Sequence, residues 1–231
     1  MRISLSRAAF IAAASVVQAK DDVRYYLNGI LIEKGPDNRP IIVATDGHRL
    51  VAAIDENGHC SDDMPDQVII DFSAETLRTV RLVKNLDQPL TIDIQPNSIT
   101  AGMIVTAAIG EYAGKQFDKD TVRALFNGCT LIDGTYPDWR RISKDSKEPA
   151  TGWYNSGYVA DFEKVARFLN AGSRKGMNGI TLRSADATSA ATVYFDGAPY
   201  AFGVLMPYRS EIENPQLPGW AAGPFKAAKA A

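Results

Sequence analysis

The string Asp46-Gly47-His48-Arg49 contains a carboxylate and an imidazole, which are side chains of the types used in general acid-base chemistry. A carboxylate beside an imidazole can move a proton near neutral pH. A hydrolase also needs a nucleophile, and the chain has no Gly-x-Ser-x-Gly motif to supply one. Aspartate followed by glycine between two apolar runs is typical of a tight turn between β-strands. The sequence therefore favours a structural hairpin over a catalytic pair, and we expect no enzyme activity.

Metal and redox chemistry also lack a motif in this chain. The two cysteines, Cys60 and Cys129, and the two histidines, His48 and His59, have neither Cys-x-x-Cys nor His-Glu-x-x-His spacing. We therefore expect no metal site and no cofactor, and a reducing, cytoplasmic location. The net charge of −2 excludes a uniformly basic surface, so any contact with DNA must be confined to one face.

The apolar pattern predicts a unit of strand, helix and further strands that recurs three times, at a spacing of roughly seventy residues. The first unit is predicted to comprise strand 3–5, helix 6–19 and strands 25–33, 40–44 and 50–55. The second comprises strand 68–70, helix 73–86, strand 90–94 and strands near 99 and 104. The third comprises a strand near 153, helix 160–170 and strands 180–183, 191–195 and 201–206. An extra helix is predicted at 117–127.

Residues 1–19 have the basic start, apolar stretch and small residues of a secretory signal peptide. Polar residues such as Ser4 and Arg7 interrupt the apolar run, whereas Phe10, Ala14 and Val17 recur at helical spacing. We therefore favour a strand followed by an amphipathic helix. No apolar run approaches the roughly eighteen residues that a membrane span needs, so we expect no membrane association.

Four strings occur in the order found in the beta subunit of bacterial DNA polymerase III, the replicative sliding clamp. They are DVRYYLNG at 22–29, ATDGHRL at 44–50, YPDWRRI at 136–142 and VLMPYR at 204–209. The first three resemble the central domain of that family, and the fourth resembles the end of its last domain. The resemblance implies an α+β sliding-clamp (DNA clamp) fold of repeated β-α-β-β-β units, with helices on one face of antiparallel sheets.

The resemblance also implies a domain organisation. We expect a central-domain-like part at 1–145 with an insertion at about 110–131, a C-terminal half-domain at 150–209 and a flexible tail at 210–231. Relative to the family, the first domain and the first half of the last domain are absent.

In the family, short partner peptides bind where these two retained parts meet, typically through a Gln followed by Leu and an aromatic or Leu. The positions of this chain that match the family's peptide pocket are Leu27, Thr45, Gly47, His48, Arg49, Leu50, Pro137, Arg141, Ile142, Met206, Pro207, Tyr208 and Arg209. An apolar slot would be formed by Leu27, Leu50, Pro137, Ile142 and Met206. Tyr208 stands where the family more often has Met, so the end of the pocket that holds the Gln is expected to differ.

Basic residues lie three apart on two of the predicted helices, Arg78 with Arg81 and Lys164 with Arg167. This spacing places each pair on one face, away from the apolar stripe. Such pairs are commonly solvated surface. With the resemblance, they and Arg24 are candidates for non-specific contact with the phosphates of double-stranded DNA, which a sliding protein needs without base readout.

Helix 160–170 has an apolar stripe of Phe162, Val165, Phe168 and Leu169. Because the sister half of this half-domain is absent, we expect the stripe to lack its usual cover. Either another subunit covers it, which we favour, or segments outside the repeats do so. Those segments contribute Phe117, Val122, Leu125, Phe126, Leu217, Trp220 and Phe225.

The resemblance implies a homo-oligomeric processivity factor on DNA that tethers DNA polymerase and clamp-loader-type proteins through short peptide motifs. An alternative is a clamp-fold adaptor or decoy that does not encircle DNA and competes for clamp-binding peptides. A third interpretation is an unrelated secreted protein with a cleaved leader.

Overall fold

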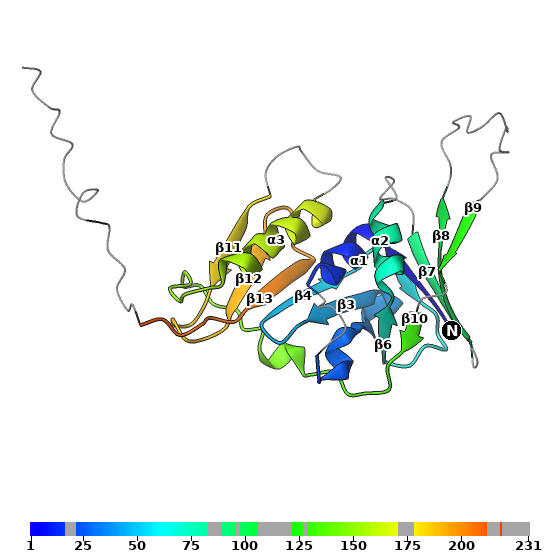
Figure 1. Cartoon of the computed structure of the whole chain (residues 1–231), viewed down its shortest axis with the longest axis horizontal. Coiled ribbons are helices and arrows are strands. Elements are labelled where there is room, and N and C mark those ends of the chain that lie inside the picture. The colour runs from blue at the N-terminus through cyan, green and yellow to red at the C-terminus, as the bar shows by residue number, and fades with distance from the viewer. Residues whose placement is uncertain are drawn as a thin grey trace, which may run out of the picture.

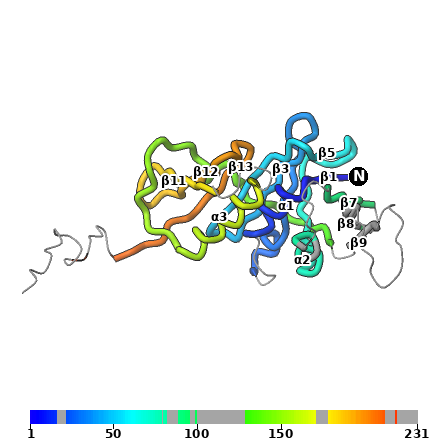
Figure 2. Tube along the Cα trace, turned by 90° about the horizontal axis from the view of Figure 1, so that it is seen from above, coloured from blue at the N-terminus to red at the C-terminus, as the bar shows by residue number. Residues whose placement is uncertain are grey.

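The computed structural model of the chain describes residues 1–16, 22–82, 89–95, 98–105, 122–126, 129–170, 178–211 and 218. These residues form two antiparallel sheets, with α-helices packed over the larger sheet (Figure 1). The helices are α1 (Arg7–Ala14), α2 (Ala74–Leu82) and α3 (Ser156–Leu169). Viewed from above, α3, α1 and α2 follow one another along the long axis of the molecule (Figure 2).

The smaller sheet has five strands. In spatial order they are β5 (His59–Cys60), β1 (Arg2–Ser6), β7 (Pro89–Gln95), β8 (Ser98–Val105) and β9 (Val122–Phe126). The larger sheet has eight strands. In spatial order they are β10 (Cys129–Leu131), β6 (Gln67–Phe72), β2 (Ile30–Lys34), β3 (Pro40–Thr45), β4 (Arg49–Ile54), β13 (Ala201–Leu205), β12 (Ala191–Phe195) and β11 (Ile180–Arg183).

The first two units exchange their first strands. β1 pairs with β7 of the second unit, for example Ile3 opposite Ile92, and β6 pairs with β2 of the first unit, for example Val68 opposite Ile32. Both units therefore have the predicted β-α-β-β-β order, and each sheet contains strands of both. This exchange makes the two units one folding body.

The third unit joins the larger sheet edge to edge. β13 pairs antiparallel with β4, placing Val204 opposite Leu50 and Phe202 opposite Ala52. The sheet therefore runs without a break from the first repeat into the last, across the predicted boundary near residue 145. This β4–β13 seam fixes the position of α3 beside α1 (Figure 1).

Helix α1 is buried on nearly all sides, which differs from the predicted amphipathic helix. It packs between α3 and α2 and rests on β3 and β4. Phe10, Ile11 and Ala12 to Ala14 are all buried. The seven residues after Arg7 are five alanines, a phenylalanine and an isoleucine, so none supplies a polar face, and the alanines allow close helix approach.

The apolar stripe of α3 is buried by described residues of the same chain, so the expectation that another subunit or the segments outside the repeats must cover it is wrong. Phe162 and Val165 are fully buried, and Leu169 is buried too. The Phe162 ring lies 6.1 Å from the Phe195 ring, and Phe168 packs at the edge of the same core. The seam also brings α1 against α3.

Two predicted elements differ because their partners are distant in sequence. Trp153 forms a single bridge with Tyr208 instead of a strand. In the first two units the first strand crosses to a sister sheet, and the described residues contain no sister sheet for the third unit. Residues 122–126, predicted as helical, form β9 because β8 offers them an open edge; residues 117–121 lie outside the described part.

Smaller differences concern element ends. Helix α1 ends at Ala14, and residues 25–28 form a 3-10 turn before β2 instead of a strand. The strands predicted near 99 and 104 are one continuous strand, β8. The N-cap prediction at Ser73 is confirmed, since its hydroxyl accepts a hydrogen bond of 3.1 Å from the Thr76 amide. The predicted helix residues 83–86 and most of the tail lie outside the described residues.

Candidate peptide-binding site

A cavity of about 210 Å³ opens at the β4–β13 seam. The turn between β3 and β4, the 3-10 turn η3 (Trp139–Arg141) and the end of β13 surround it. Its lining comprises Arg24, Tyr26, Leu27, Thr45, Gly47, His48, Arg49, Leu50, Pro137, Trp139, Ile142, Val204 and Met206. The structure thus brings together most of the residues predicted to form the peptide pocket, from segments far apart in sequence.

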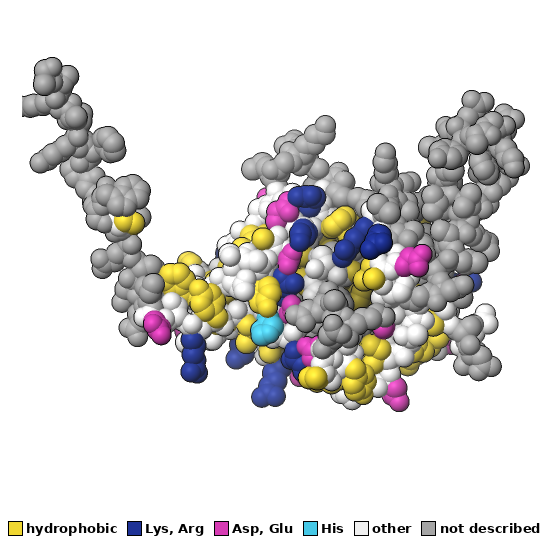
Figure 3. Space-filling model, in the orientation of Figure 1, with side chains coloured by type: hydrophobic (Ala, Val, Ile, Leu, Met, Phe, Trp, Pro, Cys, Tyr) yellow, Lys and Arg dark blue, Asp and Glu magenta, His cyan; other side chains and the backbone are white. Residues whose placement is uncertain are grey.

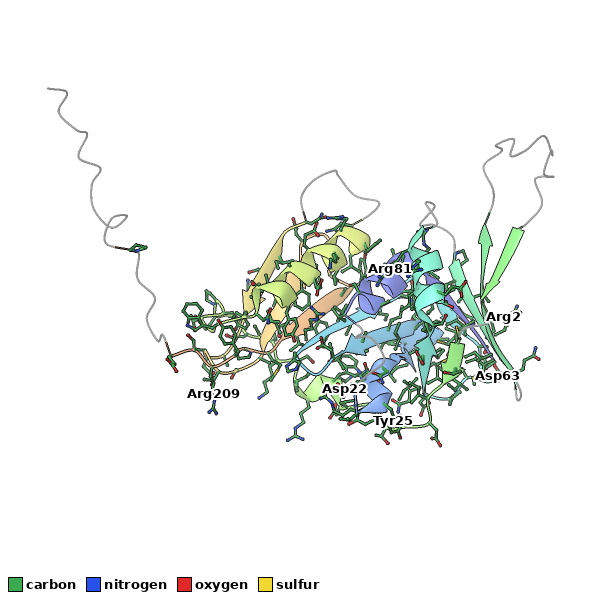
Figure 4. All side chains as sticks on the ribbon, viewed as in Figure 1. Arg2, Asp22, Tyr25, Asp63, Arg81 and Arg209 are labelled. Carbon is green, nitrogen blue, oxygen red and sulfur yellow. The ribbon has the colours of Figure 1, made fainter. Side chains whose placement is uncertain are left out.

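Four predicted pocket residues lie elsewhere. Pro207, Tyr208 and Arg209 line a second cavity of about 770 Å³, together with Thr151, Gly152, Trp153, Ala187, Thr188 and Ser210. Arg141 is exposed and lines neither cavity. Figure 4 shows Arg209 at the opposite end of the molecule from Arg2 and Asp63, and well to one side of Asp22 and Tyr25.

Sequence reasoning missed four lining residues. Tyr26, Trp139 and Val204 lie within the strings that carry the resemblance, so their position in those strings was the signal that could have identified them. The fourth is Arg24, whose contact with DNA stays a prediction; it lies at the pocket, where its guanidinium donates to Asp22 at 2.6 Å. This pairing lowers the pKa of Asp22 to about 2.

The β3–β4 turn is held by its own side chains. The Asp46 carboxylate accepts hydrogen bonds from the amides of His48 at 2.9 Å and Arg49 at 3.0 Å. The Thr45 hydroxyl accepts from the Gly47 amide at 3.1 Å. Gly47 has φ of +85°, which favours glycine. The hairpin interpretation of this string is therefore confirmed, and Asp46 is buried with its oxygens occupied.

Arg49 and His48 fasten this turn to α3. The Arg49 guanidinium donates to Asp46 at 3.1 Å, forms a second ion pair with Asp161 and lies 4.5 Å from the centre of the Tyr158 ring. The His48 ring stacks on the same tyrosine at 5.8 Å. These contacts, here called the turn clasp, commit Arg49 to structure, since its side chain is only 11% exposed.

Asp161 is the acidic partner in the turn clasp. Burial alone would raise the pKa of this carboxyl, but hydrogen bonds from Lys164 and Arg49 outweigh burial and lower the pKa below its ordinary value. The ionised carboxylate is therefore the form that the fold stabilises.

The pocket itself is apolar, with a rigid floor and an exposed rim. Leu27 and Leu50 are buried in the floor, whereas Met206 and Ile142 are 40% and 41% exposed at the rim. The Met206 amide donates to the His48 carbonyl at 2.9 Å, which ties the end of β13 to the turn. Such a cavity suits one or two apolar side chains of a ligand.

The Trp139 wall is also fixed. Its indole N–H donates to Glu33 at 3.1 Å, and the Arg140 guanidinium lies 4.0 Å from the ring centre while pairing with the same carboxylate at 2.7 Å. The wall therefore needs little ordering when a ligand binds.

The helix-borne cations do not line the pocket. Arg78 and Arg81 are exposed on α2, and basic side chains gather over the helices in Figure 3. On α3, Lys164 pairs with Asp161 at 2.5 Å and Arg167 pairs with Glu163 at 2.5 Å. The charges of α3 therefore largely cancel, and the α2 pair is the stronger candidate for attracting phosphate.

Antiparallel sheets that carry helices on one face, with an apolar pocket at the seam, define a protein of the DNA-clamp class. The family model of the DNA polymerase III beta subunit, central domain, matches residues 5–138. This match covers more than half of the chain, so the chain belongs to the DNA polymerase III beta subunit family.

Curated relatives agree with this assignment. The beta sliding clamp of Escherichia coli K12 is 32% identical over 133 residues, which cover 57% of this chain and 30% of the relative. The Vibrio cholerae beta sliding clamp is 27% identical over 230 residues, covering 93% of this chain and 56% of the relative. The chain thus spans 30 to 56% of the length of these relatives.

Solved structures show the same fold. A sliding clamp from Pseudomonas aeruginosa superposes with a TM-score of 0.59 at 19% identity, over 91% of this chain and 67% of that one. The Caulobacter crescentus beta sliding clamp gives a TM-score of 0.51 at 18% identity, over 90% of this chain and 66% of that one.

Proposed function

We propose that the chain is a clamp-type processivity factor that tethers DNA polymerase or other DNA enzymes through the pocket at the β4–β13 seam. The observation that carries this proposal is the apolar pocket, with its buried floor and its exposed rim of Met206 and Ile142. Asp46 and Arg49 beside it are occupied by structural contacts. The site is therefore suited to binding.

A short peptide with a Gln-Leu-x-Leu-Phe type of motif fits this pocket. Burying one large apolar side chain contributes roughly 1.5–3 kcal/mol. After the cost of ordering the peptide, we expect a dissociation constant in the micromolar range or weaker, which corresponds to a binding free energy no more favourable than about −8 kcal/mol.

Isothermal titration calorimetry with such a peptide tests the proposal. Met206→Ala should weaken binding by about 1–3 kcal/mol because it removes an anchor at the rim. Leu131→Ala is the matched control, since Leu131 is 46% exposed and lies outside the pocket. Absence of binding by the wild type at millimolar peptide would refute the proposed site.

Tethering also requires a hold on DNA, which we assign to the helix face with Arg78 and Arg81. The mass in solution separates encircling from adaptor function. An oligomer that retains circular DNA after linear DNA has slipped off supports the encircling clamp. A monomer that binds the peptide but retains neither circular nor linear DNA supports the adaptor or decoy.

A further inference from the structure

The chain contains a candidate ligand for its own pocket. We propose that Gln216-Leu217-Pro218-Gly219-Trp220, here called the tail motif, binds the pocket of the same chain and competes with partner peptides. This inference rests on the proposed peptide-binding function. It adds a regulatory property, namely that the free pocket is one state of an intramolecular equilibrium.

The first support is chemical. The cavity of about 210 Å³ takes one or two apolar side chains, and the tail motif offers Leu217 and Trp220 behind a glutamine. An aromatic ring suits the exposed thioether of Met206, because sulfur–aromatic contacts are favourable. The tail motif has a Gln-Leu pair and an aromatic at its fifth position, as the partner peptides proposed above do.

The second support is that described residues already bury the α3 stripe. Leu217 and Trp220 were candidates to cover the α3 stripe, but α1 and the larger sheet bury that stripe. The pocket rim, by contrast, leaves Met206 and Ile142 partly exposed. The pocket thus has apolar surface free for these residues.

The third support is reach. Five residues lead from Met206, at the pocket, to Glu211, a span of at most roughly 18 Å at full extension. Six residues lead from Glu211 to Leu217, which can span roughly 20 Å. The segment from Glu211 to Leu217 can span a longer distance than the segment from Met206 to Glu211, so the tail motif can reach back to the cavity wherever Glu211 lies.

The fourth support is the backbone and charge of the segment. Pro215 and Pro218 flank the Gln-Leu pair, and proline favours an extended conformation in the preceding residue. A restricted segment loses less entropy on binding. Glu211 and Glu213 precede it, and the exposed Arg141, next to Ile142 of the rim, has the complementary charge.

The size of the effect follows from tethering. A short linker gives an effective concentration in the millimolar range. If the tail motif alone binds with a dissociation constant on the order of 0.1 mM, it occupies the pocket most of the time and weakens an added peptide about tenfold.

The test uses full-length protein. We expect a variant with both Leu217→Ala and Trp220→Ala to bind the Gln-Leu-x-Leu-Phe peptide about tenfold more tightly than the wild type. Phe225→Ala, which removes an aromatic outside the tail motif, is the matched control and should bind like the wild type.

The outcomes are distinct. Equal affinity of the double variant and the wild type overturns the inference and leaves the proposed function intact. Absence of binding by both overturns the two together. The gain should be the same at low and high protein concentration; a gain that disappears on dilution means that the tail of a second copy is the ligand, which overturns the intramolecular form.

Discussion

The contact between Gly203 of β13 and Phe162 of α3 gives a direct test of how the third unit packs. A Cβ atom added to Gly203 would lie 2.5 Å from Cε1, 3.1 Å from Cζ and 3.2 Å from Cδ1 of the Phe162 ring. Carbon atoms in contact prefer about 3.5–4.0 Å. The ring would have to move by about 1 Å, and it is fully buried with Phe195 nearby.

This geometry sets the expected cost of Gly203→Ala. Overpacking a tight core costs about 1–3 kcal/mol. Replacing glycine by alanine offsets part of that cost, by about 0.4–1 kcal/mol, because the unfolded chain loses entropy. We therefore expect the free energy of unfolding to fall by about 1–2 kcal/mol.

Urea unfolding followed by circular dichroism measures this change, and Gly179→Ala is the matched control. The nearest atom to a Cβ on Gly179 is Asp196 Cβ at 3.4 Å, an ordinary contact. This variant should be neutral or slightly stabilised. If Gly203→Ala is as stable as Gly179→Ala, then α3 does not lie on β13 as described.

Three further predictions concern charge and thiols. Asp161→Asn should cost about 1–2 kcal/mol at pH 7 by weakening the turn clasp. Because the pKa of Asp161 is lowered in the fold, its contribution is complete above the ordinary value of 3.8 and is lost as the pH falls through the lowered value, so the two unfolding curves should converge in acid. Reversing Arg78 and Arg81 to Glu should abolish salt-dependent DNA retention, and unchanged retention at low salt would make them ordinary surface. Burial raises the pKa of Cys60 to about 11 and of Cys129 to about 12, so a thiol-reactive dye at pH 8 should label them only as fast as the protein unfolds.

Local signals in the sequence were enough to predict most elements. Strands 180–183 and 191–195 match β11 and β12, and the turn at Asp46-Gly47 joins β3 to β4 as expected. Alternation and turn residues act over a few positions, so one sequence can show them. The repeat of strand, helix and strands followed from the same signals.

Pairings between distant segments could not be predicted in this way. The strand at 122–126 pairs with the edge of β8, and Trp153 makes only a single bridge, since the described residues contain no partner sheet for it. The local propensity of these residues predicts neither pairing. The burial of α1 on nearly all sides depends likewise on α3, which begins at Ser156.

The candidate site shows the same division. Strings that match the family located the floor and rim of the pocket, because each string is local. The turn clasp joins Arg49 to Asp161, which are 112 positions apart, and neither residue type indicated the other. Arg24 also lines the pocket, and its position in the sequence alone did not indicate this.

The seam between β4 and β13 has a consequence for how the chain can be divided. Backbone pairing from Ala53 opposite Ala201 to Arg49 opposite Leu205, together with the turn clasp, joins the two parts without the covalent link at 143–152. We expect the two fragments produced by cutting the chain in that link to reassemble into the native fold. Peptide binding would then report their reassembly, because Leu27 and Leu50 belong to one fragment and Met206 to the other.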